Sequence, residues 1–200
     1  SSTSTASSTA SSSTSRTTSA TEYASVAKNA QSLETSVEAL SSKSLYNKKN
    51  ITTTASDGTK TTSYGYDTDS LYKAASDFVD KYNSLLSSGS SSTGTNIASR
   101  TAYMKTTTNQ YANALSDIGI TKDDTTGKLS IDETAFKKAD VSKIQSLFST
   151  DSGYGYQVST AASLVESAAT SAVSSSSGST YTSSGTYNAY STGTLLNSLV

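Results

Sequence analysis

Residues 115–148 read LSDIGITKDDTTGKLSIDETAFKKADVSKIQSLF, and this stretch decides the fold of the chain. Two short runs in which apolar and polar residues alternate, 118–121 and 128–132, flank a turn rich in aspartate and threonine. Such alternation on both sides of a turn predicts a β-hairpin with one apolar face. Asp132 then stands where a helix N-cap is expected, and Asp140 is a second candidate cap. The stretch therefore predicts a hairpin followed by short helices.

A second motif lies upstream, where residues 78–85 read FVDKYNSL. The two motifs in this order resemble the C-terminal region of the flagellar filament-capping protein family, the hook-associated proteins at the filament tip. The resemblance covers roughly residues 69–172. Besides the upstream motif, it rests on Leu115, Ile118, Gly119, Ile120, Gly127, Leu129, Ile131, Asp132, Glu133, Phe136, Leu147 and Phe148.

The resemblance implies a structural subunit of the bacterial flagellum, located outside the cell. Its partners would be further copies of itself or other subunits of the flagellar filament and hook-associated proteins. In that family, large distal domains precede the matching helices, and no segment of this chain is long enough to be such a domain.

Composition excludes several other classes of function. The 200-residue chain has a net charge of −1 and contains no Cys and no His, so it lacks thiolate metal ligands and the commonest general base. No basic patch predicts nucleic-acid binding, and no apolar run approaches the ~18 residues of a membrane span. The hydrophobic content of 33% is low for a globule but is compatible with a slender helical bundle.

Apolar residues at alternating steps of three and four predict helices around this central stretch. The segments are 22–45, 69–86, 96–116 and a last helix through 158–172. For the first of them, an amphipathic helix in a small bundle and a longer coiled coil explain the pattern about equally well. The apolar stripe of each helix is called its seam. The residues chosen as core or interface positions are, on the seams, Tyr23, Val26, Leu33, Val37, Phe78, Tyr82, Val158 and Val165, and, in the central stretch, Leu115, Ile118, Ile120, Leu129, Ile131, Phe136, Leu147 and Phe148.

A second hairpin is predicted over residues 50–66, where threonines and tyrosines flank the turn dipeptide Asp57-Gly58. Both of its faces are polar, so we expect it to lie against the helices, because a lone hairpin is marginal in water.

These patterns predict three domains, namely a tail, a helical bundle and a linker. Residues 1–21 are a Ser/Thr-rich tail expected to be disordered, and residues 22–173 form the helical bundle with its hairpins. Residues 174–200 are a flexible linker with an apolar end that includes Leu195 and Leu196. We expect partners to bind the surfaces around residues 158–173 and 187–200.

No group of residues in the sequence has the types and spacing that predict catalysis. Residues 122–133 nearly fit a calcium-binding loop, but Lys122 occupies the first position, where a carboxylate is required. A hairpin turn explains the same residues better. No phosphate loop or activated serine is found, so we expect no cofactor, no metal, no small-molecule substrate and no enzymatic activity.

The sequence thus predicts a mainly α protein, an elongated antiparallel helical bundle or coiled coil with one or two small β-hairpins and disordered Ser/Thr-rich ends. The favoured function is a filament-cap-like structural subunit that acts by helix–helix assembly. The alternative is a secreted or cell-surface adhesin, a binding module whose Ser/Thr-rich ends are spacers.

Overall fold

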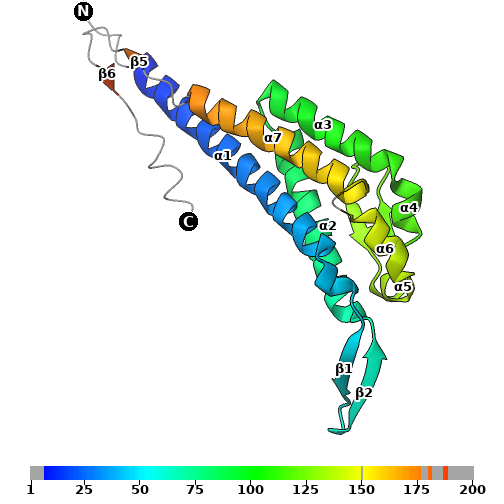
Figure 1. Cartoon of the computed structure of the whole chain (residues 1–200). Helices are drawn as coiled ribbons and strands as arrows, with labels where there is room; N and C mark the ends of the chain where they lie inside the picture. The colour runs from blue at the N-terminus through cyan, green and yellow to red at the C-terminus, as the bar shows by residue number, and fades with distance from the viewer. Residues whose placement is uncertain (1–6, 150, 177–179, 182–186, 189–200) are drawn as a thin grey trace, which may run out of the picture.

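Four long helices run antiparallel along an elongated molecule in the computed structural model, which describes residues 7–149, 151–176, 180–181 and 187–188 (Figure 1). They are α1 (Ser7–Ser41), α2 (Thr68–Ser90), α3 (Thr95–Gln110) and α7 (Tyr154–Ser176). Helix α1 packs against α2 and α7, and α3 packs against α2 and α7. This arrangement confirms the predicted antiparallel bundle.

The seams read from the sequence form the core of this bundle. On α1 the residues Val26, Ala30, Leu33, Val37 and Leu40 are buried. On α2 the buried positions include Leu71, Ala75, Phe78, Tyr82 and Leu85, and on α7 they include Val158, Ala162, Val165 and Ala169. The spacing of three and four places each set on one side of its helix, so burial of that side brings the helices together.

Helix α3 carries polar residues in its seam and still packs inside. Thr101 and Thr108 are fully buried beside Ile97 and Met104. Each buried hydroxyl donates to a carbonyl one turn earlier in the helix, Thr101 to Ile97 at 2.9 Å and Thr108 to Met104 at 3.1 Å. These bonds offset the cost of burying the hydroxyl groups.

The N-terminal region differs from its prediction. Residues 7–21 belong to α1 rather than to a disordered tail. The segment contains no glycine or proline to stop a helix, so the helix nucleated by the buried seam further along α1 can extend backwards through it. The remaining part of that prediction, residues 1–6, lies outside the described residues.

A hairpin joins α1 to α2 and projects from the end of the bundle (Figure 1). Strands β1 (Lys49–Thr54) and β2 (Lys60–Gly65) pair antiparallel around Asp57-Gly58, after a short 3₁₀-helix η1 (Lys43–Tyr46). The hairpin was predicted correctly, but its expected packing against the helices is wrong, because every residue of both strands except Ile51 and Gly65 is exposed.

The central stretch folds as a second, smaller hairpin with three short helices around it. Helix α4 (Ala112–Ser116) leads into β3 (Ile120–Lys122), which pairs with β4 (Leu129–Ile131). Helices α5 (Glu133–Lys138) and α6 (Val141–Leu147) follow. The segment predicted as one helix over 96–116 is divided at Tyr111 into α3 and α4.

The C-terminal region is described only in part. Residues 174–176 continue α7 instead of starting a linker. Strands β5 (Thr180–Tyr181) and β6 (Tyr187–Asn188) pair antiparallel, with Thr180 opposite Asn188. The predicted apolar end, with Leu195 and Leu196, lies outside the described residues.

Candidate functional site

Most residues chosen from the sequence lie in the core of the bundle. Tyr23 and Ile131 are half-buried against this core. The buried members are Val26, Leu33, Val37, Phe78, Tyr82, Leu115, Ile118, Ile120, Leu129, Phe136, Leu147, Phe148, Val158 and Val165. Val158 and Val165 therefore serve their own bundle, and a partner cannot reach them without opening it.

Part of this core is a cluster of aromatic rings from α2, α6, α7 and the residues next to them. The Phe78 ring lies 5.1 Å from that of Phe148 and 5.9 Å from that of Tyr154, with both pairs edge to face. Such pairs add to the stabilisation from burial alone. Burial raises the pKa of the Tyr154 hydroxyl, which pairs with the Thr108 hydroxyl at 3.1 Å. Tyr154 was not among the residues chosen from the sequence, because the glycines on both sides of it weaken a helix.

The motif FVDKYNSL acts through Asn83, which ties the small hairpin to α2. The Asn83 amide donates to the carbonyl of Leu129 and accepts from its N–H, both at 2.8 Å. These two hydrogen bonds satisfy both backbone groups of Leu129, which is buried on β4 beside α2. They explain why an amide side chain follows the buried Tyr82.

The caps expected in the central stretch are present. The Asp132 carboxylate accepts from the N–H of Ala135 at 2.6 Å, and the Asp140 carboxylate from that of Ser142 at 2.9 Å. Gly119 has φ +81°, and a Cβ there would lie 2.8 Å from the nitrogen of Phe136. Glycine is required at this point because the backbone adopts a left-handed conformation and lies close to α5.

The loop that nearly matched a calcium site is a hairpin turn. Asp123 accepts at 2.7 Å from both the N–H and the hydroxyl of Thr126, and these bonds lower the pKa of its carboxyl group. Lys122 pairs with Asp124 at 2.8 Å. The described part of the chain holds no group of three or more His, Cys, Asp or Glu that could bind a metal.

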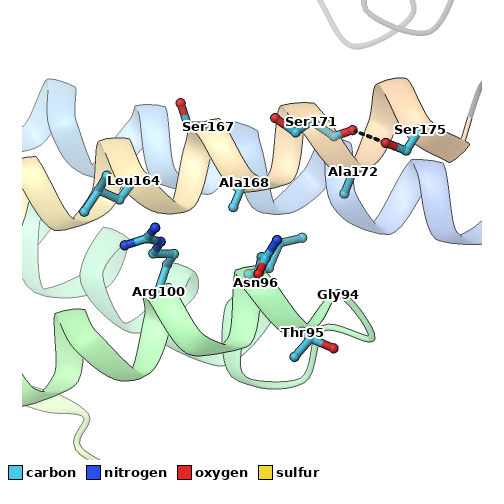
Figure 2. Close-up of a pocket in the computed structure, with 11 residues that line it drawn as sticks. Gly94, Thr95, Asn96, Arg100, Leu164, Ser167, Ala168, Ser171, Ala172 and Ser175 are labelled. Atoms are coloured by element: carbon cyan, nitrogen blue, oxygen red, sulfur yellow. Dashed lines mark hydrogen bonds between the residues drawn. The ribbon is translucent and has the colours of Figure 1, made fainter.

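A groove lies between α3 and the C-terminal half of α7 (Figure 2). It has a volume of about 480 Å³. Leu164, Ala168 and Ala172 form one stripe of α7 along it, and Asn96 and Arg100 face them from α3 (Figure 2). We call this surface the α3–α7 groove. Unlike the seam of Val158 and Val165, it is not filled by any described part of the chain.

Two carboxyl groups meet where α1 packs against α7. Glu34 of α1 lies near Glu166 of α7, and one of its oxygens, Oε1, is shielded from solvent without a hydrogen-bond donor. Burial, the charge of Glu166 and that of Glu38 raise the pKa of Glu34 from 4.5 to about 7. Two acidic groups at a helix contact cost stability when both are ionised.

Buried seams, a projecting hairpin and a groove between two helices define a protein of the helical-bundle class. Among the described helices, none is both long and apolar enough to cross a membrane. A family model described as the flagellar hook-associated protein 2 C-terminus matches residues 95–194. This match covers half of the chain, which therefore belongs to the flagellar hook-associated protein 2 family. Comparisons with curated proteins and with solved structures gave no match.

Membership of this family confirms the expected structural role in the cap of the flagellar filament, at the filament tip outside the cell. It also confirms that the chain is not an enzyme and that it associates with the flagellar filament. The adhesin alternative has no support in the comparisons. The matched region begins at the start of α3 and includes the small hairpin, α7 and the groove residues of both helices.

Proposed function

We propose that this chain acts by docking on neighbouring subunits at the filament tip, further copies of itself included, and that the β1–β2 hairpin is a contact arm. The observation that carries the proposal is the exposure of this hairpin. In the described part of the chain, β1 pairs only with β2, so the outer edge of each strand has free backbone groups. Such edges favour pairing with another chain.

The base of the arm is held firmly, which fixes the direction in which it leaves the bundle. Lys49 pairs with Asp67 at 2.9 Å, and Asp67 also caps α2 by accepting from the N–H of Ser70. The hydrogen bonds from Ser70 and the pairing with Lys49 lower the pKa of Asp67 to about 2. A fixed direction lowers the entropy cost of docking.

The exposed part of the arm carries side chains that suit contact with another subunit. Tyr64 is 72% exposed, although tyrosine is typical of the buried centre of interfaces. Thr52 and Thr62 join their hydroxyls at 3.0 Å across the strands, so the arm keeps its shape. A polar, preformed surface with one large aromatic side chain fits reversible contact between subunits.

Sedimentation velocity of the chain over a range of concentrations tests the proposal. We expect association that weakens about 5- to 30-fold in Tyr64→Ser, the effect of losing about 1–2 kcal/mol at an interface tyrosine. The matched control is Tyr103→Ser, which removes a tyrosine that is 55% exposed on α3, away from the arm. Circular dichroism of both variants checks that the helices are intact.

A second variant replaces residues 50–64 with a short Gly-Ser turn and removes the arm. The proposal is contradicted if this variant associates as strongly as the wild type. It is also contradicted if the wild type stays monomeric at every concentration and fails to sediment with isolated flagellar filaments.

A further inference from the structure

The α3–α7 groove has the chemistry of a peptide-binding surface. Leu164, Ala168 and Ala172 recur every four residues, so they form one apolar stripe along α7. The alanines lack bulk, which allows a second backbone to approach closely. A segment with one apolar face can cover this stripe, because burying apolar side chains against it removes both surfaces from water.

The opposite wall of the groove offers exposed hydrogen-bond donors that have no partner among the described residues. Within the described residues, the amide of Asn96 and the guanidinium of Arg100 bond to no other group. Figure 2 shows both side chains beside α7. The hydroxyl of Ser175, in contrast, donates to the carbonyl of Ser171 at 2.9 Å. Free donors beside an apolar stripe suit a segment that brings both apolar side chains and backbone carbonyls.

The chain that follows α7 is long enough to reach the groove. The groove ends at Ser175, and Thr180 follows the last residue of α7 by four positions. Because β5 pairs antiparallel with β6, Asn188 lies directly beside Thr180. Seven further residues lead to Leu195, a span of up to about 25 Å. The groove from Ser175 back to Leu164 is about 16 Å long at helical rise.

The sequence beyond Asn188 supplies the matching face. Residues 195–200 read LLNSLV, and at helical spacing the three leucines and the valine fall on one side while Asn197 and Ser198 fall on the other. No residue after Glu166 carries a charged side chain, so this segment brings no charge into contact with the apolar stripe.

We propose that residues 195–200 dock in the α3–α7 groove of their own chain, with the leucine face against Leu164, Ala168 and Ala172. The short path makes this an intramolecular contact with an effective concentration of about millimolar. The contact covers an apolar surface of the bundle that lies outside the β1–β2 arm, so it does not depend on the assembly proposed above.

A spin label tests this contact directly, because the chain has no cysteine of its own. The label is attached to Asn197→Cys, on the polar side of the segment, in the full chain. We expect amide signals in nuclear magnetic resonance spectra to broaden at Asn96 to Arg100 and at Ser167 to Ser175. The relaxation rates there should rise at least several-fold over those at the far face of α1.

Two matched variants carry the same label. Leu195→Ser with Leu196→Ser removes half of the apolar face, and Ser171→Trp fills the groove from an exposed position. Each is expected to reduce the broadening at the groove to the level of the far face. Unchanged broadening in both variants, or equal broadening over the whole surface of the wild type, would overturn the proposal. Broadening found only when labelled and ¹⁵N-enriched chains are mixed would show docking between chains, and would overturn the intramolecular assignment.

Discussion

Glu34→Gln is expected to stabilise the bundle at about pH 8 and to leave its stability unchanged at about pH 4. The reason is the unfavourable environment of the Glu34 carboxylate between α1 and α7. Its pKa is about 7 in the folded chain, raised by burial and by Glu166 from the ordinary 4.5. Glutamine keeps the shape of the side chain and cannot ionise, so it removes only the cost of the charge.

The sign follows from proton linkage. Between about 4.5 and about 7, the folded chain holds a proton at Glu34 that the unfolded chain has lost. The free energy of unfolding therefore falls as pH rises through this window and stays at its lower value above pH 7. Below about 4.5 the group is neutral in both states, and no penalty remains.

The magnitude follows from the size of the shift. At 1.36 kcal/mol for each unit, the shift from 4.5 to about 7 sets an upper bound of about 3 kcal/mol. The carboxyl group is only partly shielded, and solvent screening reduces this bound, so we expect a gain of about 1–2 kcal/mol above pH 7. Such a gain is measurable in a bundle of marginal stability.

The assay is urea unfolding of the wild type and the variant at several pH values, followed by circular dichroism. Glu38→Gln is the matched control, because Glu38 lies one turn away on the exposed side of α1. Its effect is expected to be a fraction of that of Glu34→Gln. A gain in Glu34→Gln that is the same at pH 4 and at pH 8 would refute the assignment of the penalty to charge.

Three further substitutions test the central stretch and the core, each by urea unfolding. Asn83→Ala is expected to cost about 1–3 kcal/mol, since both backbone groups of Leu129 lose their partner, while Ser84→Ala on the exposed side should change stability little. Gly119→Ala should cost at least about 1–2 kcal/mol, because its φ of +81° disfavours a side chain; an unchanged midpoint would contradict the close approach to α5. Phe148→Ala should cost about 3–5 kcal/mol through the cavity it leaves, and a loss below 1 kcal/mol would show that the aromatic cluster collapses around it.

Local patterns in the sequence were enough to predict the seams and the caps. Leu33 and Phe78 could be assigned to the core because the period of a helix is fixed by its backbone, whatever it packs against. Asp132 could be assigned as a cap because its bond reaches only three residues along the chain. Contacts of this range do not depend on the tertiary fold.

Features that depend on distant neighbours could not be predicted in this way. Glu34 and Glu166 meet in the bundle but lie far apart in the sequence, and nothing near either residue signals the other. Tyr154 was missed because glycine normally weakens a helix, yet Gly155 here permits contact with Phe148, whose backbone oxygen would lie 3.0 Å from an added Cβ. The α3–α7 groove arises from the way two helices pack and has no local signature.

The β1–β2 hairpin also has a consequence for how this scaffold can grow. Its tip at Asp57-Gly58 points into open space, and both ends of the loop return to the bundle through one narrow stem. Exposed tips of this kind accept inserted domains without disturbing the core. A foreign domain inserted between these two residues would lie beyond the end of the bundle, so the hairpin is a suitable site for insertion.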